Sequence, residues 1–195
     1  GTSGPLNRRG LLAGTAAAAA MGGCARAPRP GEEPRVTILR AKYDQGLFDV
    51  MRRLLDEHQL DVRGKRVLLK PNLVEFDPGA AINTEPVFVL AAMEAFRSRG
   101  ASHVGIAEGP GHRRPTLDLA EAAGYFRTVP DFERLFTDLN LDDVAGVKLP
   151  GQARRLDFLY LPKTALACDL LVSLPKMKTH HWAGATLGMK NLFGL

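Results

Sequence analysis

The stretch KRVLLKPNLV at residues 65–74 decides the fold class, because a short apolar run in it ends abruptly in polar residues. Residues 66–69, RVLL, predict a buried strand, and the polar triplet KPN follows it directly. The same arrangement recurs where HVGIA at 103–107 precedes Glu108, and where LLVSL at 170–174 precedes a lysine-rich segment. Continuous apolar strands of this kind are typical of a parallel sheet that is buried on both faces.

Helical patterns lie between these strands. Residues 47–58 place apolar side chains at helical spacing. Pro86 suits the first turn of a helix that ends at Gly100, with Thr84 as its expected cap. A further helix is expected at 116–123. Strands alternating with helices predict an α/β fold, with a mostly parallel sheet covered by helices on both faces.

Shorter elements complete this prediction. Residues 36–40, VTILR, predict a first strand, and another strand is expected to end at Asp138. Residues 146–149 and 156–161 predict a small β-hairpin insertion. A final helix is expected at 183–193. No G-x-G-x-x-G motif follows any predicted strand, so a dinucleotide-binding site is not supported.

Residues 1–24 predict a signal peptide. Arg8 and Arg9 precede an alanine-rich run of about a dozen residues, which is shorter than the roughly 20 that span a bilayer as a helix. The arginine pair resembles a twin-arginine leader, which the export machinery would recognise. The sequence MGGC resembles a lipobox, in which Cys24 would be acylated.

Residues 25–34 are rich in proline and arginine, and they predict a flexible tether. We expect a single α/β domain at 35–195 behind this tether. The leader and the tether together predict an exported protein, periplasmic or on the outer face of the membrane, held there by a lipid anchor at Cys24.

The charge of the chain gives no reason to expect a nucleic-acid partner. The formal net charge is +5, but four of the 26 basic residues and none of the 21 acidic residues lie in residues 1–30. The rest of the chain is therefore close to neutral. The two cysteines, Cys24 and Cys168, form no C-x-x-C pair, so this sequence alone ligates no iron–sulfur cluster.

Four polar clusters each follow a predicted strand: KPN at 70–72, EGP at 108–110, DLN at 138–140 and PKMKTH at 175–180. In open α/β sheets, ligands bind in the crevice beyond the carboxyl ends of the strands. We therefore expect the four clusters to contribute to one shared polar site.

Lysines in or beside apolar segments predict a small anionic ligand at this site. Four lysines have this context: Lys70, Lys176, Lys178 and Lys190. A lysine can bind phosphate or carboxylate, and burial can lower its pKa enough for base chemistry. The alternative is a structural network in which lysines pair with Glu108, Asp138 and Asp169.

The candidate catalytic residues are Glu108, His180 and Lys176, since a carboxyl or imidazole group here could move a proton. Glu108, Asp138 and His180 are also candidate ligands for a divalent metal with mixed oxygen and nitrogen donors. The remaining site residues are candidates for substrate binding: Lys70, Asn72, Asn83, Thr84, Lys178, Thr179, Lys190 and Asn191.

These stretches together resemble the bacterial and archaeal family known as domain of unknown function 362. The resemblance is carried by VLLKPNLV (67–74), NTEP (83–86), GASHVGIAEGP (100–110), GY (124–125), DLN (138–140) and, above all, LLVSLPKMKTHHWAGATLGMKNLFG (170–194). It implies no particular activity. The family pattern continues past KNLFG at 190–194, so the resemblance implies a domain that is truncated at its C-terminal end.

Three functions remain open from the sequence. The first is an envelope enzyme that acts on a small anionic substrate, with a divalent metal or a redox partner. The second is a lipid-anchored binding protein that captures a small anion or a metal without catalysis. The third is a purely structural polar network that closes the sheet.

Overall fold

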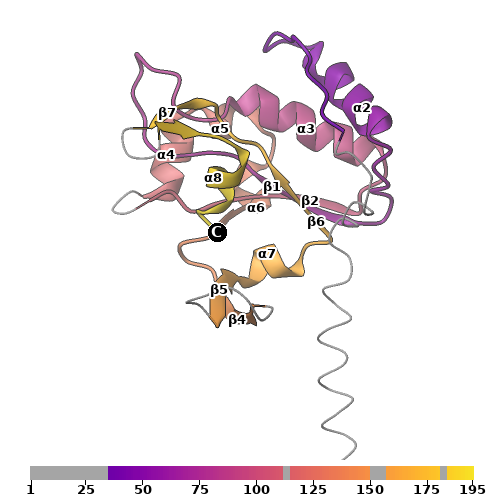
Figure 1. The fold of residues 1–195 in the computed structure, drawn as a ribbon. Coiled ribbons are helices and arrows are strands. Elements are labelled where there is room, and N and C mark those ends of the chain that lie inside the picture. The colour runs from indigo at the N-terminus through magenta and orange to yellow at the C-terminus, as the bar shows by residue number, and fades with distance from the viewer. Residues whose placement is uncertain (1–34, 112–114, 150–156, 181–183) are drawn as a thin grey trace, which may run out of the picture. The chain divides into compact units, whose positions relative to one another are not determined.

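The structure is a computed structural model that describes residues 35–111, 115–149, 157–180 and 184–195. The predicted leader and tether, with Arg8, Arg9 and Cys24, lie outside these residues. Four strands form a parallel sheet in the order β3-β2-β1-β6, namely β1 (Arg66–Lys70), β2 (His103–Glu108), β3 (Phe136–Asp138) and β6 (Leu170–Ser173) (Figure 1). The predicted α/β class with a parallel sheet is confirmed.

Two antiparallel hairpins lie outside this sheet. The first pairs β4 (Val144–Lys148) with β5 (Phe158–Pro162), as the sequence predicted. The second pairs β7 (Lys178–His180) with β8 (Gly184–Thr186), and the sequence analysis did not predict it. This second hairpin matters for the site, because it carries residues of the lysine-rich segment that follows β6.

The described helices are α2 (Leu47–Glu57), α3 (Pro86–Ser98), α4 (Thr116–Ala122), α5 (Tyr125–Thr128), α6 (Phe132–Leu135), α7 (Lys163–Ala167) and α8 (Gly188–Leu192). The first three begin and end within one or two residues of the positions that apolar spacing, Pro86 and Gly100 predict.

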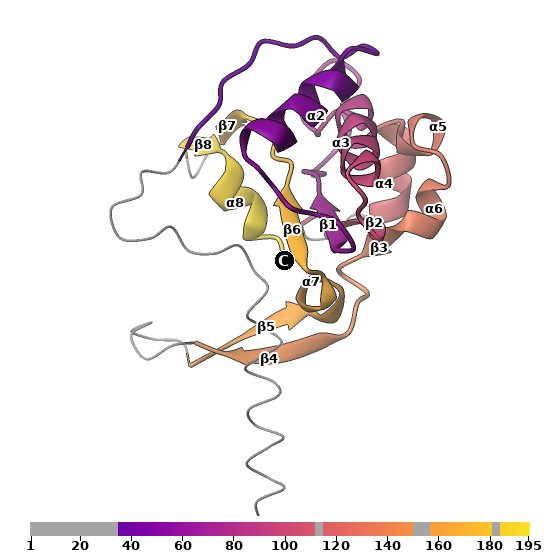
Figure 2. The ribbon, with the colours of Figure 1, turned by 90° about the vertical axis from the view of Figure 1, so that its right-hand side faces the viewer.

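The two faces of the sheet are covered unequally, because successive side chains of a strand point to opposite faces. On one face, Val67 and Leu69 of β1 belong to a large core that includes buried residues of α2, α3 and α4. On the other face, Leu68 and Ala107 form a small cluster, against which Ala165 of α7 packs. Figure 2 shows α2 and α3 on one side of the sheet and α8 on the other.

The strand order makes the carboxyl end of β1 the expected position of a ligand-binding crevice. The chain runs outward from β1 through β2 to β3, and then returns to pair β6 with the opposite side of β1. The segment that leaves β1 leads to α3, whereas the segment that leaves β6 leads to α8 on the other face (Figure 2). Where connections diverge in this way, neighbouring strands leave a gap at their carboxyl ends, and ligands bind in that gap.

Three local predictions were wrong. Residues 36–40 form no strand, and Val36 and Ile38 are 78% and 90% exposed, because an apolar segment becomes a strand only where it finds a pairing edge. The last helix covers only Gly188–Leu192; residues 184–186 instead form β8, helped by the left-handed φ of +72° at Gly184. Glu85, not Thr84, is the N-cap residue of α3.

Candidate functional site

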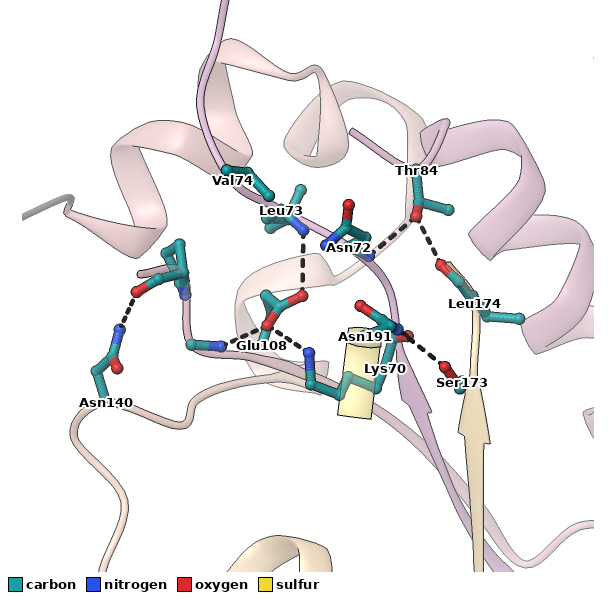
Figure 3. A network of polar contacts seen from close by, with 12 residues as sticks. Lys70, Asn72, Leu73, Val74, Thr84, Glu108, Asn140, Ser173, Leu174 and Asn191 are labelled. Atoms are coloured by element: carbon teal, nitrogen blue, oxygen red, sulfur yellow. Dashed lines mark hydrogen bonds and ion pairs between the residues drawn. The ribbon is translucent and has the colours of Figure 1, made fainter. Parts of the chain in front are cut away.

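A buried ion pair lies at the carboxyl ends of β1 and β2. Lys70 Nζ is 2.6 Å from Glu108 Oε1, and the two side chains are only 1% and 3% exposed (Figure 3). The backbone N–H of Gly109 also donates to Oε1, at 2.9 Å, and the N–H of Leu73 donates to Oε2, at 3.1 Å. Both carboxylate oxygens of Glu108 therefore accept hydrogen bonds within the fold.

The surroundings of this pair have opposing effects on the pKa of the Glu108 carboxyl group. Burial raises the pKa of Glu108 above its ordinary value, while the Lys70 ammonium and the backbone N–H groups of Leu73 and Gly109 act in the opposite sense. Gly194 passes close over the pair, since a Cβ built there would lie 3.6 Å from Lys70 Nζ. The backbone at Gly194 therefore lies within van der Waals range of the pair and helps to cover it.

Thr84 links the segments that follow the carboxyl ends of β1 and β6. Its hydroxyl accepts a hydrogen bond from the N–H of Asn72, at 2.9 Å, and donates one to the carbonyl of Leu174, at 2.6 Å (Figure 3). The buried hydroxyl of Tyr125 donates to the carbonyl of Thr84, at 2.7 Å, and fixes it from α5. Asn83 holds the loop after β1 by accepting from the N–H of Val74, at 2.8 Å. Thr84 and Asn83 therefore shape the crevice.

Asn191 ties α8 to the same strand ends. Its Nδ2 donates to the carbonyl of Lys70 and to Ser173 Oγ, both at 3.0 Å (Figure 3). The side chain is buried, with a residue exposure of 2%. The helix that carries Lys190 and Asn191 is therefore positioned by β1 and β6, the two strands between which the crevice opens.

The lysines of the segment after β6 differ from Lys70. Lys178 is half-buried and donates to the carbonyl of Ile82, at 2.8 Å. Burial lowers the pKa of Lys178, and the nearby charges of Lys190 and Lys176 add to this effect, whereas Glu75 and Glu108 oppose it. Lys176 Nζ lies 4.0 Å from Glu85 and 5.7 Å from the ring centre of Tyr43. Lys178 and Lys190 form no ion pair within the part of the chain that the structure describes.

Other predicted residues lie apart from this centre or face solvent. Asp138 accepts a hydrogen bond from the N–H of Asn140, at 2.9 Å, within its own turn. The backbone N–H of Arg66 donates to Asp169, and this bond, together with the side-chain pair with Arg66 at 3.3 Å, lowers the pKa of Asp169. Thr179 is exposed, and His180 is half-buried at the end of β7.

The predicted metal ligands do not form a cluster. Among the residues that the structure describes, no three His, Cys, Asp or Glu side chains lie close enough together to hold a metal ion. Glu108 is engaged by Lys70, and Asp138 by its own turn. The structure therefore brings Lys70, Asn72, Thr84, Glu108 and Asn191 into one network, without Asp138.

Three residues of the site were missed by the sequence analysis: Tyr125, Ser173 and Thr186. Tyr125 lies in the GY pair that contributes to the family resemblance, and Ser173 is the polar residue inside the apolar run LLVSL. Thr186 is buried and pairs in register with Lys178 across the β7–β8 hairpin. Ser173 could have been predicted as a site residue, because it is a polar residue within an otherwise apolar strand.

An apolar cavity borders this network at Ser173 and Leu174. It has a volume of about 560 Å³, is mostly apolar, and is lined by residues of α2 and by Leu170–Ser173 at the outer edge of the sheet. Its lining contains no lysine. In the described part of the chain, no helix is both long and apolar enough to cross a membrane.

Comparisons with known proteins agree with the resemblance read from the sequence. Residues 67–195 match the family described as domain of unknown function (DUF362). A curated protein of Synechocystis, named as a thylakoid-associated protein, is 33% identical over 133 residues, which is 67% of this chain. The chain spans 39% of the length of that relative. No solved structure matches the chain.

Proposed function

The chain belongs to the family of domain of unknown function 362, and we propose that it binds a small anionic ligand at the carboxyl ends of β1, β2 and β6. The observation that carries this proposal is the grouping of Lys176, Lys178 and Lys190, whose charges are close enough to interact, and of which Lys178 is half-buried and forms no ion pair among the described residues.

Burial and mutual repulsion both act against the charged form of Lys178. A phosphate or carboxylate placed among the three ammonium groups would counter both effects, because its negative charge adds to that of Glu75 and Glu108 near Lys178 and of Glu85 near Lys176. Compact ammonium groups on flexible stems suit such an anion. The ligand would therefore complete an electrostatic arrangement that is unfavourable when the site is empty.

In this proposal, the pair of Lys70 and Glu108 supports the site from within the fold and does not itself contact the ligand. The Glu108 carboxylate accepts three hydrogen bonds within the fold, one of them from Lys70, and the backbone carbonyl of Lys70 accepts a fourth from Asn191. The pair fixes the start of the loop after β1. Thr84 and Asn83 hold the next residues of this loop by accepting hydrogen bonds from its backbone. We assign Lys70 and Glu108 to positioning and the three lysines after β6 to ligand binding.

Catalysis by the same site is the second candidate function, and the lowered pKa of Lys178 favours it. A lysine with a lowered pKa can exchange a proton with a bound substrate closer to neutral pH. His180, on the same short strand, is the second candidate for moving a proton. Glu108 is a weaker candidate, because proton transfer would first require it to leave Lys70.

Isothermal titration of the full chain with inorganic phosphate, acetate and citrate tests the binding proposal. Lys178→Met should weaken anion binding roughly 10- to 100-fold, as expected for the loss of one charged hydrogen bond of about 1.5–3 kcal/mol. Lys148→Met, which removes an exposed lysine of the β4–β5 hairpin, is the matched control and should leave binding unchanged. Equal affinities of the two variants would exclude the lysine site.

We further propose that the protein is exported and lipid-anchored at Cys24. The support is the twin-arginine pair Arg8-Arg9 and the MGGC sequence. The name of the Synechocystis relative describes membrane association of that protein. Radiolabelled palmitate should be incorporated into the full chain but not into Cys24→Ala, and Arg8→Lys with Arg9→Lys should block export. Labelling that persists in Cys24→Ala would refute the anchor.

A further inference from the structure

Three residues of the site carry buried polar atoms without a hydrogen-bond partner among the described residues. In the described part of the chain, four buried side-chain nitrogen or oxygen atoms have no hydrogen-bond partner. Three of them belong to site residues: Asn72 Oδ1, Thr186 Oγ1 and Asn191 Oδ1. These residues are 8%, 2% and 2% exposed. Buried polar groups nearly always have partners, so three such atoms among the site residues indicate that a partner is supplied from outside.

The identity of the Asn191 oxygen follows from its contacts. The other amide atom of Asn191 faces two oxygens, the carbonyl of Lys70 and Ser173 Oγ, and must therefore be the nitrogen donor towards the carbonyl. The unpartnered atom is thus a hydrogen-bond acceptor. It lies beside the strand ends together with the side chain of Asn72 (Figure 3).

Thr186 places a second unpartnered group next to the lysines. It pairs in register with Lys178 across the β7–β8 hairpin, and Lys190 precedes Asn191 directly in α8. Lys178 and Thr186 therefore come from one hairpin, and Lys190 and Asn191 from the helix that follows it. A ligand held by Lys178 would lie beside Thr186, its partner across the hairpin.

An acceptor oxygen repels an anion and needs a donor. A ligand that carried only a negative group would satisfy the lysines and leave Asn191 Oδ1 without a partner. A ligand with an added hydroxyl would satisfy both. An ammonium donor is disfavoured here, because Lys176, Lys178 and Lys190 already place positive charge around the site.

We propose that the ligand is a small hydroxylated anion, such as a hydroxycarboxylate or a polyol phosphate. Its anionic group binds the lysines, and its hydroxyl donates to Asn191 Oδ1, with Thr186 Oγ1 and the amide of Asn72 available to further hydroxyls. This inference rests on the proposed anion site and specifies its substrate class.

Matched pairs of probes test the inference by titration of the full chain: glycerol 3-phosphate against n-propyl phosphate, and glycolate against acetate. The hydroxylated member of each pair should bind at least roughly tenfold more tightly, since a site built for a hydroxyl rejects the analogue that lacks it. Thr186→Val, which keeps the shape of the side chain, should reduce the preference for glycerol 3-phosphate over n-propyl phosphate.

Asn191→Leu should abolish the preference, with folding checked by circular dichroism because this change also removes two hydrogen bonds within the fold. Thr128→Val in α5 is the control and should change neither affinity. Equal binding of both members of each pair would overturn the hydroxyl inference and leave the anion site standing. No binding of any of the four probes would overturn the anion site itself, and this inference with it.

Discussion

Lys70 and Lys178 both follow an apolar strand at the same edge of the sheet, yet their surroundings differ. Lys70 is 1% exposed and lies 2.6 Å from a carboxylate. Lys178 is half-buried, donates to the backbone carbonyl of Ile82, and has Lys190 and Lys176 as nearby charges. Lys70 forms an ion pair within the fold, whereas Lys178 forms none among the described residues and feels Glu75 and Glu108 only at a longer distance.

The presence or absence of an ion pair within the fold indicates whether a lysine serves stability or ligand binding, and it does so more clearly than burial alone. A lysine whose counter-ion comes from the fold stabilises the fold, and replacing it should cost folding free energy. A lysine whose counter-charge is absent costs stability until a ligand arrives, and replacing it should cost affinity. We call Lys70 with Glu108 the structural half of the site, and Lys176, Lys178 and Lys190 the functional half. Substitutions in the structural half should lower the free energy of unfolding, and substitutions in the functional half should lower the affinity for the ligand.

Glu108→Gln tests the structural half and should have the largest effect. It leaves the Lys70 ammonium buried without a counter-ion, and breaking a buried pair in this way costs about 3–5 kcal/mol. Urea denaturation of the full chain measures the loss. Glu94→Gln is the matched control, because Glu94 forms an exposed pair with Arg97, and it should cost at most about 1 kcal/mol.

The double variant Lys70→Met with Glu108→Gln sharpens this test. Removing both charges should be less costly than the sum of the single changes, because no buried charge is left unpaired. Additive losses of the two single changes would contradict a direct coupling between Lys70 and Glu108.

Thr84→Val tests the link between the exits of β1 and β6. The change keeps the shape of the side chain but leaves the N–H of Asn72 and the carbonyl of Leu174 without their partner. We expect a loss of about 1–3 kcal/mol in the free energy of unfolding, because unpaired buried groups lose their full solvation. Thermal unfolding followed by circular dichroism measures it, with the exposed Thr179→Val as control. A loss no larger than that of the control would mean that the crevice does not depend on this hydroxyl.

The main elements of the fold could be predicted because their patterns are local. RVLL, HVGIA and LLVSL are apolar without interruption, as strands buried on both faces must be, and each became a strand of the parallel sheet. VTILR has the same local pattern and failed, because a strand also needs a pairing edge, which local sequence does not encode. The last helix was shortened for a related reason, since pairing across the β7–β8 hairpin overrode its helical spacing.

The candidate site could be located from the sequence, but its division of roles could not. Strand ends converge in any parallel sheet, so Lys70, Asn72 and Glu108 were expected to meet. Which lysine would pair with which acid depends on side-chain distances of a few ångströms, and the choice between Glu108, Asp138 and Asp169 remained open until the structure showed Glu108 at Lys70. Thr186 and Tyr125 were missed because their roles depend on tertiary neighbours.

The pH dependence of anion binding tests the functional half and should show the smallest effect. Only the protonated form of Lys178 attracts an anion, and the pKa of Lys178 is lowered from 10.5 by burial and by Lys190. Affinity for phosphate should therefore begin to fall with rising pH below the range of an ordinary lysine, by up to about tenfold, or about 1.4 kcal/mol. In the ligand-free protein the sign is opposite: the unfolded chain holds this proton more tightly, so Lys178 makes stability rise with pH between its folded pKa and 10.5.

Lys178→Arg is the variant that isolates this titration, because a guanidinium stays charged throughout the range. It should bind phosphate with an affinity that no longer falls over the same pH interval, as measured by isothermal titration in buffers of equal ionic strength. If the decline in affinity persists unchanged in Lys178→Arg, the titrating group is not Lys178. The contrast with Lys70 would then rest on burial alone, and the ligand-binding role would pass to Lys176 and Lys190.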